Sequence, residues 1–273
     1  DYVLPLMIAA PYAVIFQSIV NRNYVRVLIT PDGAVRYSSG QYALMTDLDT
    51  KQDKAPATDE IYFDITADGV ISLKPEYRGA CPSSRYTDGI SENGLNKAGS
   101  YNSELPENII IPEVVNGVAV TALSVGMFSG NTAVKSITIP EHITEIPKGF
   151  AVMAINLREI NGTENIKVLG GAAFAQTLIE KAYFPKLMQI GGKAHFQYCV
   201  NMISADLGNT ITALPEKTFF YCERLAALRN TENVSTVGAS AFVGAKRLKT
   251  LPFFDKLTSV GDYAFCLCRA DPD

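Results

Sequence analysis

The apolar residues between about Val118 and Phe265 follow one pattern that recurs along the chain. Each unit opens with two apolar residues separated by two others, continues through Gly or Pro to a small residue and Phe, and then alternates before the next opening. The opening residues are Val120, Ile143, Ile166, Leu187, Ile211, Val234 and Leu257, at intervals of 23, 23, 21, 24, 23 and 23 residues. Seven copies at so regular a period predict a solenoid, whose coils bury their inner faces only by stacking on one another.

Each unit predicts two short extended segments joined by a turn. Residues 137–139 (Ile-Thr-Ile) alternate as a half-buried strand does, and Pro140 ends that strand. Residues 143–146 (Ile-Thr-Glu-Ile) form the second extended segment. The Gly-x-x-Ala-Phe segment that follows, clearest at 238–242 and 261–265, turns the chain and places Phe inside the coil.

The start of the chain is a run of apolar residues, 2–20, whose length suits a membrane span. Pro5, Pro11, Gln17 and Ser18 oppose a helix, and no Lys or Arg precedes the run. We therefore favour buried strands here and expect no stable membrane span. A truncated export signal and a membrane anchor stay open as alternatives.

A hairpin and a linker follow the apolar run. Residues 24–29 and 34–37 flank Thr-Pro-Asp-Gly at 30–33, where Pro presets φ and Gly supplies the positive φ that closes a turn. Residues 47–60 are polar and charged and contain Pro, which is typical of a linker at a domain boundary.

A second hairpin is predicted at 61–66 and 70–73, around Ala-Asp-Gly, where it can cap the first coil of the solenoid. Residues 77–104 are rich in Ser, Gly and Asn and predict a long surface loop. The predicted parts are an N-terminal hydrophobic and hairpin segment with its linker (1–58), a hairpin cap with an inserted loop (59–108), and the solenoid (109–273).

Composition limits the kinds of partner. The chain has 24 basic and 28 acidic side chains, a formal net charge of −4 and a pI near 5.3. Nucleic-acid-binding domains carry a basic footprint, so we expect no nucleic-acid partner. The chain begins with Asp, and its last unit stops before a return strand, so we expect it to be a fragment.

The cysteines indicate neither a disulfide framework nor a metal site. The five cysteines are Cys81, Cys199, Cys222, Cys266 and Cys268. An odd count does not indicate a disulfide framework, although a Cys199–Cys222 bridge between neighbouring coils is an alternative. Cys266 and Cys268 have no matching Cys or His pair, so we expect no metal site.

The two histidines and the Gly pairs also have structural interpretations. His195 could be a ligand or a general base, but its interior position beside Phe196 favours a packed side chain. His142 follows a strand-ending Pro and is predicted to be solvated. Gly170-Gly171 and Gly191-Gly192 are interpreted as coil turns, since neither opens a helix as a phosphate loop does. With no Ser–His–Asp arrangement either, we expect a protein that is not an enzyme and has no cofactor.

Residues 111–123 (Ile-Pro-Glu-Val-Val-Asn-Gly-Val-Ala-Val-Thr-Ala-Leu), followed by units with Cys three residues after Phe, resemble the BspA-like class of bacterial leucine-rich repeats. The resemblance covers about Ile61 to the C-terminus. It implies a β-rich solenoid, a right-handed coil of about 23-residue repeats with an N-terminal β-hairpin cap. It also implies that the Cys after each Phe is a small core residue.

Some units depart from the pattern. His195 stands where Phe is expected and Phe196 follows it, which predicts one inserted residue. Gly162 replaces the apolar residue that ends a strand, and Pro147 and Pro215 replace the Gly of the turn. We expect these coils to be looser.

The outward position of each first strand is the candidate binding site. These positions are Thr138, Asn161, Tyr183, Asp206 and Arg229. Because neighbouring strands lie about 4.8 Å apart, their side chains should form a column on one sheet face. Such a mixture suits recognition of a protein or a glycan, and an ordinary solvated sheet face is the alternative.

The resemblance implies a non-enzymatic binding or adhesion module, extracellular or on the surface of a bacterial cell, because similar proteins act there. The alternative is a structural or receptor-binding component of a phage-like tail, and thus of a phage virion. Only the polar linker around residues 49–54, which is similar to spacers in tail fibres, favours this alternative.

Overall fold

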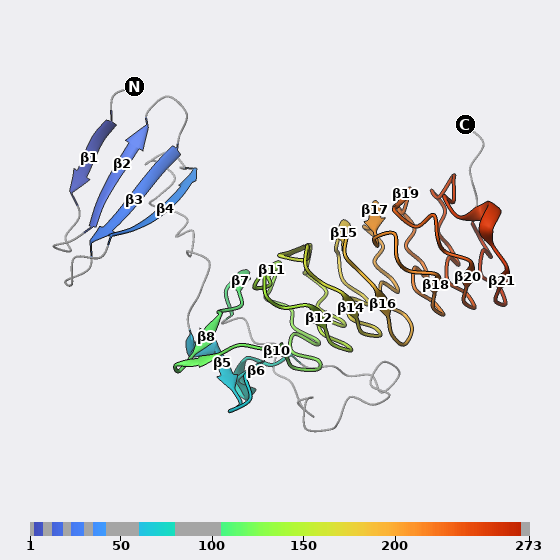
Figure 1. Ribbon diagram of the computed structural model, residues 1–273, viewed down its shortest axis with the longest axis horizontal. Coiled ribbons are helices and arrows are strands. Elements are labelled where there is room, and N and C mark those ends of the chain that lie inside the picture. The colour runs from blue at the N-terminus through green and yellow to red at the C-terminus, as the bar shows by residue number, and fades with distance from the viewer. Residues whose placement is uncertain are drawn as a thin grey trace. The chain divides into compact units, whose positions relative to one another are not determined.

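A computed structural model of the chain describes residues 61–79 and 105–268 in full, and the backbone of residue 60 and of four strands between residues 3 and 41 (Figure 1). The chain divides into two compact units, residues 1–55 and 56–273. The predicted turn at 30–33, the linker up to residue 59, and the loop residues 80–104 with Cys81 lie outside the described residues.

The first unit contains a four-stranded antiparallel sheet in the order β1-β2-β3-β4. Its strands are β1 (Val3–Met7), β2 (Ala13–Ser18), β3 (Asn23–Ile29) and β4 (Val35–Gln41). The apolar run 2–20 therefore contains two strands. The pairing of β3 with β4, which starts at Ile29 opposite Val35, confirms the predicted hairpin.

The second unit begins with the predicted cap. After the short 3-10 turn η2 (Glu60–Tyr62), β5 (Phe63–Ile65) pairs antiparallel with β6 (Val70–Leu73), and η3 (Pro75–Tyr77) follows. Strand β6 also pairs parallel with β10 (Ala122–Leu123) of the first coil. The cap thus closes the coil interior with side chains such as Phe63 and Leu73, which are fully buried.

Each coil contributes one strand to each of two ribbons of parallel strands, which follow one another along the array in Figure 1. The first ribbon consists of β7 (Asn108–Ile110), β11 (Ser136–Thr138), β13 (Glu159–Asn161), β15 (Lys181–Tyr183), β17 (Ser204–Asp206) and β19 (Ala227–Arg229). The second consists of β10, β12 (Glu145–Ile146), β14 (Val168–Leu169), β16 (Gln189–Ile190), β18 (Ala213–Leu214), β20 (Thr236–Val237) and β21 (Ser259–Val260). The predicted β-rich solenoid is confirmed.

Two prolines divide the second ribbon into three blocks: β10, which joins the cap strands as β5-β6-β10, then β12-β14-β16, and then β18-β20-β21. Within a block, the residue after a strand donates its N–H to the neighbouring coil, as Gly170 does to Ile146 O at 2.8 Å. Pro147 and Pro215 occupy this position at the two junctions and have no N–H to donate. The looser coils predicted at these prolines agree with the positions of the breaks. We call β12-β14-β16 the central block.

A further hairpin lies between the cap and the first full coil. Strands β8 (Val114–Val115) and β9 (Val118–Ala119) pair antiparallel around Asn116-Gly117, whose φ angles are 49° and 78°. Two residues with positive φ are typical of a type I′ turn, for which Asn-Gly is the preferred sequence. The chain also forms one short 3-10 turn near its end, η5 (Phe254–Lys256).

The interior is built around a row of phenylalanine rings. Its members are Phe128, Phe150, Phe174, Phe196, Phe219, Phe242 and Phe265, with ring centroids 5.4–6.1 Å apart from one coil to the next. All but Phe265 are fully buried, and the opening apolar residues of the coils pack around them. The row confirms the prediction that Phe lies inside each coil.

Phe196, and not His195, occupies the Phe position of its coil. Its ring stacks between those of Phe174, at 5.9 Å, and Phe219, at 5.5 Å. His195 takes the small-residue position before it, where its carbonyl oxygen accepts a hydrogen bond from Phe174 N. Ala241 O accepts the equivalent bond from Phe219 N. The predicted inserted residue is present, but it lies in the turn before His195: Phe196 comes six positions after Ile190, whereas Phe174 comes five positions after Leu169, the partner of Ile190.

Two positions in each coil adopt a left-handed backbone, with φ between 52° and 73°. The first column contains Gly126, Gly149, Ala172, Ala194, Lys217, Ser240 and Tyr263, and the second contains Gly130, Met153, Gln176, Tyr198, Tyr221, Gly244 and Leu267. Residues in both columns donate N–H to the next coil, as Ala172 does to Lys193 O at 2.8 Å. The ladder of hydrogen bonds thus imposes a conformation that costs roughly 1–2 kcal/mol for a residue with a Cβ.

Candidate functional site

The predicted column lies on the outer face of the first ribbon. Thr138 stands opposite Asn161 on neighbouring strands, and Tyr183 stands opposite Asp206, which in turn stands opposite Arg229. The ribbon divides between β13 and β15, so the column consists of a pair and a triplet. The structure therefore brings Tyr183, Asp206 and Arg229 together, and we call this triplet the strand face.

The strand face offers one aromatic and two charged groups. Tyr183 is 48% exposed, and Arg229 is also exposed. Asp206 is partly occupied, because its Oδ1 accepts a hydrogen bond from Gly208 N at 3.1 Å and its Oδ2 one from Asn230 Nδ2 at 2.8 Å. These bonds fix the Asp206 carboxylate on the strand that lies between those of Tyr183 and Arg229.

His195 is buried in the interior of its coil. Its side chain is fully buried, and Nε2 donates to Gly191 O at 2.8 Å. Burial lowers its pKa to about 4, against a smaller upward effect of the Gly191 bond. A histidine that is neutral and sealed from solvent positions the Gly191 turn and has no access to a substrate. His142 is exposed, as predicted, and its Nε2 lies 2.6 Å from Val120 O.

The buried cysteines are free thiols. Cys199 Sγ donates to Phe174 O at 3.1 Å, and Cys222 Sγ donates to Phe196 O at the same distance. Burial raises the pKa of the Cys199 thiol to about 11 and that of Cys222 well above its usual value. Each thiol therefore fills space and also bonds to the preceding coil, in place of the Cys199–Cys222 bridge considered above.

Within residues 61–79 and 105–268, no three His, Cys, Asp or Glu side chains come together as a group that could hold a metal ion. In the part of the chain that the structure describes, no helix combines the length and the apolar character needed to cross a membrane.

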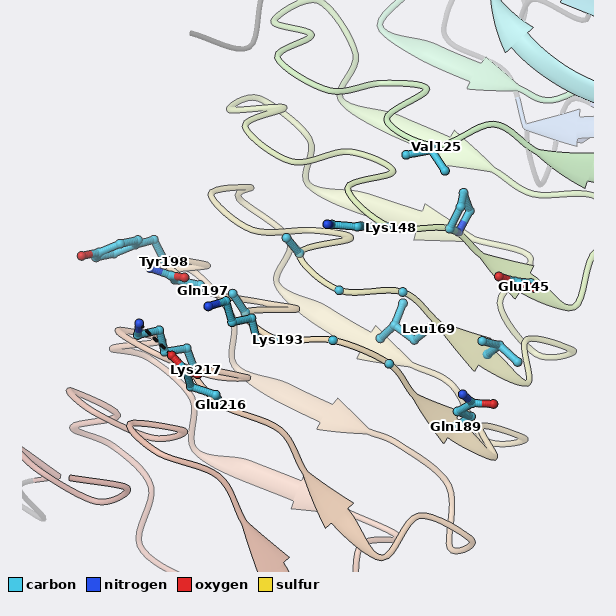
Figure 2. A pocket seen from close by; sticks show the side chains of 18 residues that line it. Val125, Glu145, Lys148, Leu169, Gln189, Lys193, Gln197, Tyr198, Glu216 and Lys217 are labelled. Atoms are coloured by element: carbon cyan, nitrogen blue, oxygen red, sulfur yellow. Dashed lines mark ion pairs between the residues drawn. The ribbon is translucent and has the colours of Figure 1, made fainter. Parts of the chain in front are cut away.

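A groove of about 960 Å³ lies over the second ribbon, across the central block (Figure 2). Glycine backbone forms much of its floor, at Gly170-Gly171 and Gly191-Gly192. Figure 2 shows one edge with Lys193, Gln197, Tyr198, Glu216 and Lys217, and the opposite edge with Glu145 and Gln189.

Sequence reasoning missed this groove, although both Gly pairs were recognised as coil turns. The signal was present: two neighbouring coils carry Gly-Gly where the coils on either side carry Pro147-Lys148 and Pro215-Glu216. A depression flanked by larger residues follows once the coils are stacked.

Comparison with known proteins matches the repeats to one family. Residues 101–203 and 154–270 match the family described as "BspA type Leucine rich repeat region", in 6 copies. No curated protein matches the chain.

Solved structures of bacterial leucine-rich repeat proteins are similar to the chain. A leucine-rich repeat protein of T. pallidum shares 17% identity and a TM-score of 0.52, covering 79% of this chain and 100% of that one. One from Bacteroides ovatus shares 20% identity and a TM-score of 0.42, covering 59% of this chain and 58% of that one. A leucine rich cell surface protein of Faecalibacterium prausnitzii shares 15% identity, with a TM-score of 0.34, and the match covers 80% of this chain and 81% of that one. At these identities the T. pallidum match supports the solenoid fold alone.

Proposed function

Because the chain belongs to the family of BspA-type leucine-rich repeat proteins, we propose that it is a non-enzymatic binding module whose strand face contacts a protein or glycan ligand. Leucine-rich repeat proteins are typically non-enzymatic, and the family favours a protein-interaction or adhesion-type role. The phage-tail alternative receives no support from these matches.

One observation carries the proposal: Tyr183, Asp206 and Arg229 stand side by side on three paired strands. Tyrosine and arginine are, with tryptophan, enriched among the side chains that dominate binding energy at interfaces. Strands hold these groups at fixed spacing, so little side-chain and loop entropy is lost when a ligand binds. We place the module on the outside of a bacterial cell, as family members typically are.

The test is binding of the full chain to an array of glycans and matrix proteins, followed by the triple variant Tyr183→Ala/Asp206→Ala/Arg229→Ala. We expect ligands of the wild type to bind the triple variant at least about tenfold more weakly, since two lost anchors cost roughly 1–2 kcal/mol each. Because Asp206 also bonds to Asn230, the double variant Tyr183→Ala/Arg229→Ala separates binding from local structure.

A matched control removes three exposed charged side chains elsewhere on the array: Glu164→Ala, Arg224→Ala and Arg247→Ala. This control should bind as the wild type does. If every ligand binds the double variant as tightly as the wild type, the strand face is not the binding site.

A further inference from the structure

The groove over the central block owes its shape to four coils. Pro147-Lys148 closes one end and Pro215-Glu216-Lys217 the other, and the two coils between them carry Gly-Gly. With strands about 4.8 Å apart, the floor from Lys148 to Lys217 spans about 14 Å along the array. The groove is thus long enough for several units of a chain molecule.

One of the floor glycines is not required by the fold. Gly191 does not have the left-handed backbone of Gly192, and the nearest atom to a Cβ at Gly191 is Leu169 O at 3.9 Å. By contrast, a Cβ at Gly170 would lie 2.3 Å from Lys148 N. A side chain at position 191 would therefore project into the groove without disturbing the coil. His195 bonds to the carbonyl of Gly191 from the interior and fixes this part of the floor.

The groove carries positive charge on a protein that is acidic overall. Lys217 Nζ pairs with Glu216 at 2.9 Å, and Lys193 lies close enough to Glu216 to help lower the pKa of that carboxyl. Lys148 and Lys193 form no ion pair within 4 Å among the described residues. Glu145 lies on the opposite edge, so the lining carries three lysines against two carboxylates. Since Glu216 is paired with Lys217, the ammonium groups of Lys148 and Lys193 outnumber the one remaining carboxylate and can attract an anion.

Tyr198 lies on the same edge of the groove as Lys193 (Figure 2). Tyr198 is 39% exposed, and its ring stacks on that of Tyr221 at 5.5 Å with an interplanar angle of 28°. Tyr221 in turn lies over Gly244, where a Cβ would lie 3.1 Å from the Tyr221 ring. The Tyr198 ring is therefore held in place before any ligand arrives, with its exposed part free to contact apolar C–H groups.

We propose that this groove binds an acidic oligosaccharide, a chain of sugars that carry carboxylates. Carboxylates would pair with Lys148 and Lys193, and a sugar ring would pack on Tyr198. Hydroxyls would bond to the amide of Gln189 and to the exposed backbone of the glycine floor. This site is distinct from the strand face, which belongs to the other ribbon.

The lining favours a saccharide over an acidic peptide. A bound peptide takes most of its affinity from an open strand edge or from apolar pockets. In the groove, β14 is paired on both sides, by β12 and β16, so it offers no edge. Leu169 on the floor is fully buried, so the accessible surface combines charged side chains, amides and glycine backbone with only two exposed large hydrophobic side chains, Val125 and Tyr198.

The test is calorimetric titration of the full chain with a hexamer of galacturonic acid, at low salt. The methyl ester of the same hexamer keeps the rings and hydroxyls but lacks the charge. We expect the acid to bind at least about tenfold more tightly than the ester, and added salt to weaken it. The double variant Lys148→Glu/Lys193→Glu should lose at least about tenfold in affinity, and Gly191→Gln, which fills the floor, should lose as much.

The control Arg224→Glu/Arg247→Glu makes the same change in net charge outside the groove and should bind as the wild type does. Circular dichroism checks that every variant is folded. Equal binding of acid and ester, unchanged binding by the folded groove variants, no binding at millimolar hexamer, or tighter binding of hexaglutamate would each overturn the proposal. None of these results bears on the strand face, because the groove variants leave it intact.

Discussion

Glycine substitutions usually destabilise a folded protein, but in the left-handed columns we expect them to stabilise it. Ser240 belongs to the first column, with φ 56°, and its N–H donates to Asp262 O at 2.8 Å. The Ser240→Gly change removes the steric cost of this conformation, roughly 1–2 kcal/mol, and adds about 0.5–1 kcal/mol of chain entropy to the unfolded state. We expect a net stabilisation of about 0.5–1 kcal/mol.

Ser259→Gly serves as the matched control. Ser259 lies in β21 with an extended backbone and is exposed, so glycine there should cost about 0.5–1 kcal/mol. The two variants remove the same hydroxymethyl group but should move stability in opposite directions. Their difference, about 1–2 kcal/mol, is larger than either effect alone.

The assay is urea unfolding followed by far-ultraviolet circular dichroism, with midpoints compared at equal slopes. Thermal midpoints should differ by roughly 2–8 °C between the two variants, given about 2–4 °C per kcal/mol for a domain of this size. If Ser240→Gly lowers the midpoint as much as Ser259→Gly does, the left-handed backbone carries no cost, and the reasoning fails.

Three further predictions concern the interior. Phe196→Ala should lower the free energy of unfolding by about 3–5 kcal/mol, because it empties a fully buried position between two stacked rings; urea unfolding measures the loss. His195 has a folded-state pKa of about 4, below its ordinary 6.5, so stability is full above pH 6.5 and is lost as the pH falls towards 4. From pH 7 to pH 5 the wild type should lose about 2 kcal/mol more than His195→Gln, measured by urea unfolding at both pH values. Iodoacetamide should label exposed Cys266 in the native protein but leave Cys199 and Cys222 unlabelled, as peptide mass mapping would show.

Each of the three has its own control. Phe265→Ala removes a ring that is only partly buried at the last coil, so it should cost less than Phe196→Ala, and an equal loss would contradict the packing argument. Parallel pH dependence in wild type and His195→Gln would show that His195 is not sealed from water. Labelling of Cys199 at the rate of Cys266 would show that the coils open readily.

Much of the fold could be predicted because the repeated residues act within their own coil. The spacing of Val120, Ile143 and the later opening residues, together with the recurring Phe, is enough to define coils and their interior. Pro147 and Pro215 could be recognised as weak points because a missing N–H has the same consequence in any ladder. The sequence Asn116-Gly117 also indicates a hairpin turn, but this hairpin was not predicted.

Other features depend on neighbouring coils and could not be read from one unit. Tyr198 and Lys217 do not favour positive φ, and only the hydrogen bonds between stacked coils hold them there. Asp206 looked like a free charge in the sequence, but Asn230 of the next coil bonds to it. The groove is hollow because two Gly pairs become adjacent, which no single unit reveals.

The proline breaks also determine how the array would respond to mechanical force. Pulled from its C-terminal end, a solenoid releases one coil at a time, since each coil is held by its neighbour alone. One coil of about 23 residues adds roughly 80 Å of extended chain, at about 3.5 Å per residue. The coil carrying Pro215 lacks one hydrogen bond to the central block, so the force should fall when β18 detaches, after β21 and β20 have been released. Under tension, the junctions at Pro147 and Pro215 are thus the weaker points of the second ribbon, and the groove lies between them.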